Sequence, residues 1–127
     1  MAVVLVTEDE PLIREFAQFI LHQCGHETLD AAAFDEALAI LSSERRIDVL
    51  FTDINLRPLL HGGLELARRA IELRPILRVI YTTGMAMNDG MRSMFVDGAF
   101  FIPKPYQTES LSAVLSQVIA CQRNELM

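Results

Sequence analysis

Acidic, hydroxyl and amine side chains stand at the ends of four apolar runs of the sequence. They are Glu8-Asp9-Glu10, Asp53, the pair Thr82-Thr83, and Lys104, which is the only lysine. Carboxylates that are brought together repel one another and must be neutralised. A magnesium ion does this with a few carboxylates and water molecules, and a lysine ammonium adds a compact positive charge that can hold an anionic oxygen. A site of this composition suits a phosphoryl group.

Parallel strands are the elements that can bring these side chains together. Five apolar runs predict strands at residues 2–6, 26–31, 48–52, 78–82 and 100–102, of which the second is the most polar and suggests an edge strand. Helical spacing predicts five helices, at residues 11–24, 35–41, 64–73, 89–96 and around 111–119. This alternation favours an α/β fold, a doubly wound parallel sheet with helices on both faces and its functional site at the carboxyl ends of the strands.

Length and composition limit the possible classes of protein. The 127 residues suffice for one domain, which we assign to residues 1–127, and 51% of them are apolar. The formal net charge of −6 argues against nucleic acid as a partner, and no apolar stretch is long enough to span a membrane. Cys24 and Cys121 predict buried or half-buried thiols rather than a disulfide. With no signal peptide visible, we expect a cytoplasmic protein.

Five short motifs occur in the order typical of a known family. They are Glu8-Asp9-Glu10-Pro11, Asp53, Gly63-Leu64-Glu65-Leu66, Thr83-Gly84 and Lys104-Pro105-Tyr106. With these motifs the sequence resembles the receiver domain of two-component response regulators, which has the chemotaxis-regulator-like fold, over essentially its whole length. The resemblance implies a flavodoxin-like (βα)5 sheet with strand order 2-1-3-4-5. It also implies a partner, a histidine kinase or histidine phosphotransfer protein, whose phosphohistidine donates a phosphoryl group.

The resemblance assigns Asp53 as the phosphoacceptor that becomes an acyl phosphate. It implies Mg²⁺ as the cofactor. Asp9, Asp53 and the backbone carbonyl of Asn55 would ligate the ion, and Glu8 would contribute through a water molecule.

The resemblance assigns the remaining site residues to the bound phosphoryl group and to the response that follows. Lys104 would pair with the phosphoryl group, and Thr83 would bond to it and move on activation. Phe101 stands at the aromatic switch position, three residues before the lysine. The output would be a contact with a downstream protein on the face formed by helix four, strand five and helix five.

Three positions depart from the usual pattern or leave its register open. Glu8 replaces a more common Asp, and Phe101 lacks the hydroxyl group of the Tyr that is often found there. A switch at Phe101 would therefore be a change of packing. Of Thr82 and Thr83, we choose Thr83 because the small residue Gly84 follows it.

Two further features stay open on the sequence alone. The loop at residues 54–63 is about two residues longer than usual, which leaves the places of Arg57 and His61 undetermined. Four methionines follow strand four, and they would either form an adaptable binding face or fill the core beneath helix four: Met85, Met87, Met91 and Met94.

We therefore expect a single-domain response regulator that labels itself and is not a turnover enzyme. It would signal through a phosphorylation-dependent protein contact or a phosphorelay, without a DNA-binding output domain. One alternative is a receiver domain excised from a hybrid kinase. Another is a small phosphatase of the haloacid dehalogenase type, although Asn55 stands where that class has a second Asp and the motif lies mid-chain. A binding module with an inactive site is opposed by the intact site residues.

Overall fold

Apolar, largely β-branched strands form the centre of a five-stranded sheet in the computed structural model of this chain. The structure describes the backbone of residues 1–126 and the side chains of residues 1–120. The strands are β1 (Val3–Thr7), β2 (Glu27–Ala31), β3 (Val49–Asp53), β4 (Arg78–Thr83) and β5 (Phe100–Pro103). All neighbouring strands are parallel and their order is β2-β1-β3-β4-β5, which confirms the predicted topology.

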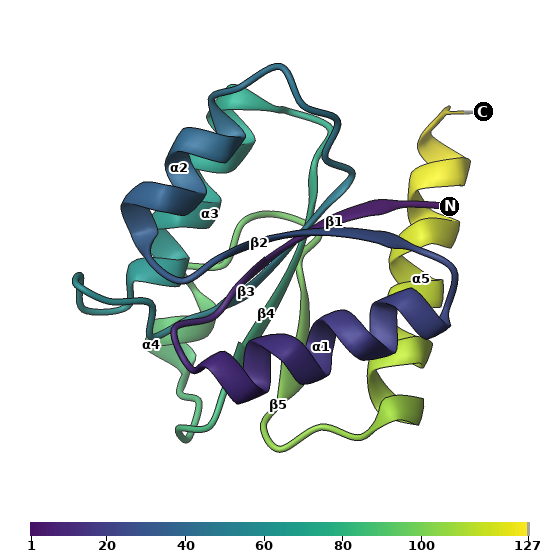
Figure 1. The fold of residues 1–127 in the computed structure, drawn as a ribbon. Coiled ribbons are helices and arrows are strands. Elements are labelled where there is room, and N and C mark those ends of the chain that lie inside the picture. Colours follow the sequence, from purple (N-terminus) through teal and green to yellow (C-terminus); the bar gives the residue numbers. More distant parts are fainter. Residues whose placement is uncertain (127) are drawn as a thin grey trace.

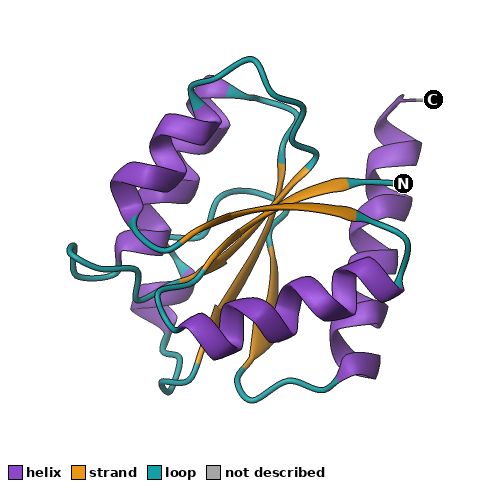
Figure 2. Cartoon of the chain, in the orientation of Figure 1, coloured by secondary structure: helices purple, strands orange, loops and turns teal. Residues whose placement is uncertain are grey.

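Five helices cover the two faces of the sheet (Figures 1 and 2). They are α1 (Pro11–Gln23), α2 (Phe34–Leu41), α3 (Gly62–Leu73), α4 (Asp89–Arg92) and α5 (Thr108–Leu126). Because successive strand residues point to opposite faces, Leu5 packs with α2 and α3, whereas Val4 and Val6 pack with α1 and α5. The sheet therefore separates two apolar cores, and its central strands are buried on both sides.

The edge strand β2 and the end of α1 agree with the sequence. Strand β2 lies at an edge and is the most exposed strand, as its polar sequence predicts. Helix α1 ends before Gly25, whose φ of +86° favours glycine.

Helix α4 is much shorter than predicted. The sequence pattern indicated a helix through Val96, but α4 ends at Arg92. The Ser93 hydroxyl donates to the carbonyl oxygen of Gly90 at 2.7 Å, and the Met94 amide donates to Met91 instead of continuing the i to i−4 pattern. In a longer α-helix the Met94 amide would donate to the Gly90 carbonyl oxygen. The Ser93 hydroxyl competes for this acceptor.

The segment that leads from β3 to α3 makes a close backbone approach. A Cβ atom on Gly63 would lie 1.9 Å from the carbonyl oxygen of Asp53, and one on Gly62 would lie 2.0 Å from that of Leu56. Only glycine therefore allows the start of α3 to pack this tightly against the end of β3. The helix begins at Gly62, two residues before the predicted Leu64.

Two expectations about the surface have different outcomes. Cys24 is exposed, and its Sγ lies 3.1 Å from Ser112 Oγ, so the predicted burial of this thiol is wrong. It is the C-terminal capping residue of α1, outside the helical pattern on which the prediction of burial was based. The side chain of Cys121 lies outside the described residues. Among the helices in the described part of the chain, none is long and apolar enough to cross a membrane.

Candidate functional site

Three carboxylates meet at the carboxyl edge of the sheet. Glu8 and Asp9 follow β1, and Asp53 ends β3, which is the strand paired with β1. One oxygen from each of the three carboxylates lies within 4.8 Å of the others. Glu8 and Asp53 are buried, with 3% and 6% of their surface exposed. Three carboxylates that offer hard oxygen ligands and together carry an excess of negative charge fit a magnesium ion.

Lys104 lies between two of these carboxylates. Its Nζ is 2.5 Å from Glu8 Oε1 and 3.1 Å from Asp53 Oδ2. Burial opposes the charged amine, but the Glu8 and Asp53 carboxylates outweigh it and raise the pKa of Lys104. Burial also raises the pKa of Glu8, against the hydrogen bond from Lys104, and the Asp53 charge acts in the same direction as burial. The ammonium therefore stays charged and partly neutralises the cluster.

Hydrogen bonds connect Thr83 to the Asp53 side of the site. The Asn55 amide N–H donates to Asp53 Oδ1 at 3.1 Å, and the Asn55 side chain donates to Thr83 Oγ1 at 3.0 Å. Thr83 Oγ1 also accepts from the Met85 amide at 3.1 Å. Thr82 Oγ1 is buried and has no hydrogen-bond partner among the described residues. Of the two threonine hydroxyls, that of Thr83 is therefore the one hydrogen-bonded to Asn55 in the described part of the chain.

The ring of Phe101 lies among other aromatic side chains between β5 and the segment that follows α4. Its centroid is 6.1 Å from that of Phe95, which in turn is 4.2 Å from that of Tyr81. The Arg92 guanidinium carbon lies 5.5 Å from the Phe101 ring centroid. Phe101 is half-buried and therefore has both a core side and a surface side.

The methionines after β4 divide between the two roles that the sequence left open. Met91 is buried in the core and Met87 packs against it half-buried. Met85 and Met94 are each 59% exposed. Met91 and Met87 therefore fill the core, whereas Met85 and Met94 are on the surface, where the binding-face interpretation stays a prediction.

Three contacts of the site were not expected from the sequence. The Thr7 hydroxyl donates to Thr52 Oγ1 beneath the carboxylates, where both residues pair in register on β1 and β3. Tyr106 packs against Phe16 and Phe51, and burial, followed by the charges of Glu8 and Asp53, raises its pKa. The third contact joins Arg57 to Asp9. Of these three contacts, only the one between Thr7 and Thr52 had a signal in the sequence. Each of the two predicted neighbouring strands has a threonine near its end, and the predicted pairing places the two threonines side by side.

The longer loop brings Arg57 to the site, whereas His61 lies at the start of α3. Arg57 Nε donates to Asp9 Oδ2 at 2.8 Å. His61 adopts a left-handed conformation with φ of +52°, and its Nδ1 is buried without a hydrogen-bond partner in the described part of the chain. The structure shows no contact of His61 with the described carboxylates of the site.

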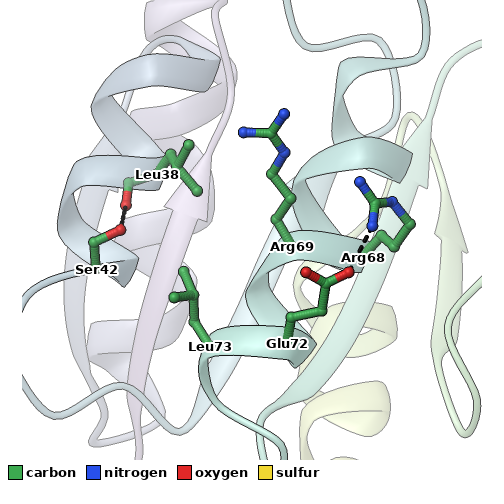
Figure 3. A pocket seen from close by; sticks show the side chains of 6 residues that line it. All are labelled: Leu38, Ser42, Arg68, Arg69, Glu72 and Leu73. Carbon is green, nitrogen blue, oxygen red and sulfur yellow. Dashed lines mark hydrogen bonds and ion pairs between the residues drawn. The ribbon is translucent and has the colours of Figure 1, made fainter.

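A surface pocket of about 640 Å³ lies between α2 and α3, away from these carboxylates (Figure 3). It is lined by Leu38, Ser42, Arg68, Arg69, Glu72 and Leu73. The Arg68 and Glu72 side chains pair with each other, and the Ser42 hydroxyl donates to the Leu38 carbonyl. The lining therefore offers no cluster of groups comparable to that at the sheet edge.

Five parallel strands in the order 2-1-3-4-5, with helices on both faces, define the CheY-like receiver fold. The response regulator receiver domain family matches residues 4–116, and the chain belongs to that family. Receiver domains are phosphoacceptor signalling domains of two-component systems, are generally not enzymes, and typically bind Mg²⁺ at an acidic pocket. This membership sets aside the haloacid dehalogenase alternative.

Three relatives illustrate the similarity. A CheY-like response regulator receiver domain protein from Methanospirillum hungatei JF-1 has a TM-score of 0.86 and 27% identity, over 98% of both chains. The sensor kinase CckA of Brucella abortus is 27% identical over 95% of this chain and 13% of its own length. The phosphate regulon transcriptional regulatory protein PhoB of Pseudomonas aeruginosa is 30% identical over 91% of this chain and 51% of its own length. The chain thus spans about half or less of these two curated relatives.

Proposed function

We propose that Asp53 accepts a phosphoryl group from the phosphohistidine of a histidine kinase or histidine phosphotransfer protein, in a reaction that requires Mg²⁺. The observation that carries this proposal is the arrangement of Asp53 at the end of β3, beside two further carboxylates and in contact with Lys104 Nζ. A carboxylate can act as an oxygen nucleophile and form a covalent aspartyl phosphate.

The metal would be held by Asp9, Asp53 and the backbone carbonyl of Asn55, with Glu8 acting through a water molecule. The convergence of the three carboxylates supports this ligand set. When bound, Mg²⁺ supplies positive charge that neutralises the oxygens of the transferred group. The longer side chain of Glu8 already reaches Lys104 Nζ, whereas the ion pair described for Asp9 is with Arg57.

The transfer forms one bond and breaks one. An Asp53 carboxylate oxygen attacks phosphorus, the bond between phosphorus and the imidazole nitrogen breaks, and the electron pair returns to that nitrogen. Lys104 then exchanges its contact with the Asp53 oxygen for one with a phosphoryl oxygen, because its flexible side chain carries a charge-assisted donor. Thr83 Oγ1 donates its proton to a second phosphoryl oxygen after moving toward Asp53.

The phosphorylated domain would be read by a downstream protein at the surface formed by α4, β5 and α5, without nucleic acid contacts of its own. The exposed Met85 and Met94 side chains support an adaptable protein contact there. We propose that the domain acts in the cytoplasm as a single-domain response regulator. A receiver within a hybrid kinase is the second candidate, favoured by the similarity to a sensor kinase over 95% of this chain.

Intact-mass measurement after incubation with acetyl phosphate tests the proposal. With Mg²⁺ the wild-type protein should gain one phosphoryl mass, and Asp53→Asn should gain none. Asp30→Asn is the matched control, because Asp30 lies on β2 and pairs with Arg14. Labelling that persists in Asp53→Asn, or that is equal in the presence of a chelator, would contradict the proposal.

A further inference from the structure

Arg57 holds one of the proposed metal ligands. Its Nε donates to Asp9 Oδ2 at 2.8 Å. The Arg57 side chain is 76% exposed and the Asp9 side chain is 15% exposed, so the guanidinium covers the solvent side of this carboxylate. An ion pair this exposed contributes little to folding stability.

The backbone around Arg57 is fixed, whereas the loop beyond it is open. Leu56 is fully buried, and the Arg57 carbonyl accepts from the Phe34 amide at 3.3 Å. The following residues reach into solvent, and Leu60 is 86% exposed. Residues 58–60 are exposed, so a change at the Arg57 side chain has more room to alter this part of the loop than its buried base.

We propose that Arg57 competes with Mg²⁺ for Asp9, so that metal binding releases the guanidinium and the loop at residues 58–61. This inference rests on the proposed function, because it assumes that Asp9 ligates the metal. The physical reason is that Asp9 Oδ2 is already occupied by a cation, and a divalent ion at the same carboxylate repels that cation. Metal-free protein would keep Arg57 on Asp9, and metal-bound protein would present Arg57 and the exposed leucines to an incoming phosphodonor.

Isothermal titration with MgCl₂ on the complete chain tests the competition. Arg57→Ala should bind Mg²⁺ about three- to tenfold more tightly than the wild type, which is the range expected for removing one exposed positive charge beside a dication. Arg57→Lys keeps the charge and should stay near the wild-type affinity. Arg46→Ala is the matched control, because Arg46 is also an exposed arginine that pairs with an aspartate, Asp48 before β3.

Amide chemical shifts in the same titration report on the loop. In the wild type, Mg²⁺ should shift the amides of Leu59 and Leu60, and in Arg57→Ala these shifts should be absent. Equal or weaker Mg²⁺ affinity in Arg57→Ala would overturn the competition while leaving the proposed function intact. Absence of Mg²⁺ binding in every variant would overturn the proposed metal site, and the competition with it.

Discussion

At the scale of single residues, the site is a balance between three carboxylates and two cations. Lys104 contacts Glu8 and Asp53 on the buried side of the cluster, and Arg57 contacts Asp9 on its exposed side. Removing Lys104 should lower the folding stability more than removing Arg57. Without Lys104, the buried carboxylates of Glu8 and Asp53 would have neither water nor a cation to stabilise their charge.

Lys104→Met should therefore destabilise the metal-free protein, by up to about 3 kcal/mol. It should leave Mg²⁺ affinity unchanged or increased, because a positive charge beside the metal is lost. Urea unfolding with and without MgCl₂ measures the first effect and calorimetric titration the second. The variant should still gain a phosphoryl mass, but its phosphorylated form should fail to signal. A variant that binds Mg²⁺ much more weakly and signals normally would place Lys104 outside the site.

At the scale of elements, the structure links Thr83 to the segment that would respond. The Met85 amide donates to Thr83 Oγ1, so an inward movement of Thr83 breaks this bond and frees the loop before α4. Helix α4 itself has only one turn, capped by the Asn88 side chain, which accepts from the Met91 amide. Such a short helix is held mainly by its packing and adjusts easily.

We predict that a non-hydrolysable phosphoryl mimic shifts amide resonances throughout residues 85–106. A charge-assisted hydrogen bond from Thr83 provides about 1.5–3 kcal/mol. A full switch from 1:99 to 99:1 needs about 5.5 kcal/mol. Lys104 and the metal must therefore contribute, or the switch is partial, and we expect a partial switch. Phe101 would leave its contact with Arg92 as it turns inward, against Phe95.

Thr83→Ala is the control for this experiment, since it should confine the shifts to the surroundings of Asp53. If the wild-type shifts are confined in the same way, with residues 85–106 unchanged, the prediction that phosphorylation alters this segment is wrong. A simple relay of the phosphoryl group would then describe the domain better.

The start of α3 gives a second prediction at this scale. Gly63→Ala should cost about 1–3 kcal/mol of folding free energy, because its Cβ would meet the Asp53 backbone, which cannot move aside cheaply. It should also slow labelling, since Asp53 would be displaced. Gly84→Ala is the matched control, with only an ordinary 3.9 Å contact to Lys104 Cβ. Equal unfolding midpoints in urea for the two variants would contradict this account.

The sequence predicted the elements and the convergence of Glu8, Asp9, Asp53 and Lys104, because periodicity marks the strand ends and the family resemblance implies the strand order. It did not predict the short α4, which depends on one serine hydroxyl competing for a carbonyl. Nor did it predict the contact of Arg57 with Asp9. The loop is longer than is usual in the family, so the resemblance does not indicate where its side chains lie. The motif contained Gly63, but only the structure shows why a glycine is required there. A Cβ atom at this position would lie 1.9 Å from the carbonyl oxygen of Asp53.

At the scale of the whole molecule, the sheet concentrates negative charge at one edge while apolar cores fill both of its faces. The cores stabilise the fold, and the carboxylates at the edge oppose it, because buried like charges repel. A ligand that binds only the folded edge then adds its binding free energy to the stability of the entire domain.

Magnesium should therefore raise the free energy of unfolding, by about 2.7 kcal/mol when its concentration is 100 times the dissociation constant. Chemical denaturation in MgCl₂ and after chelation measures this difference. Asp9→Asn and Asp53→Asn should each reduce the gain, whereas Asp30→Asn should keep it. A gain of the same size in all four proteins would mean that the ion acts elsewhere.

The lone lysine has a practical consequence for labelling chemistry. Because Lys104 is the only lysine in the sequence, an amine-directed reagent has only its Nζ and the terminal amine as targets. Reductive methylation with isotope-enriched formaldehyde and a borohydride reductant would make the dimethylated Lys104 the one side-chain reporter inside the acidic cluster. Its resonance would follow every change in the surrounding charge without any engineered tag. In the free protein the Lys104 side chain is 14% exposed, so its rate of modification would itself measure how often this edge of the sheet opens.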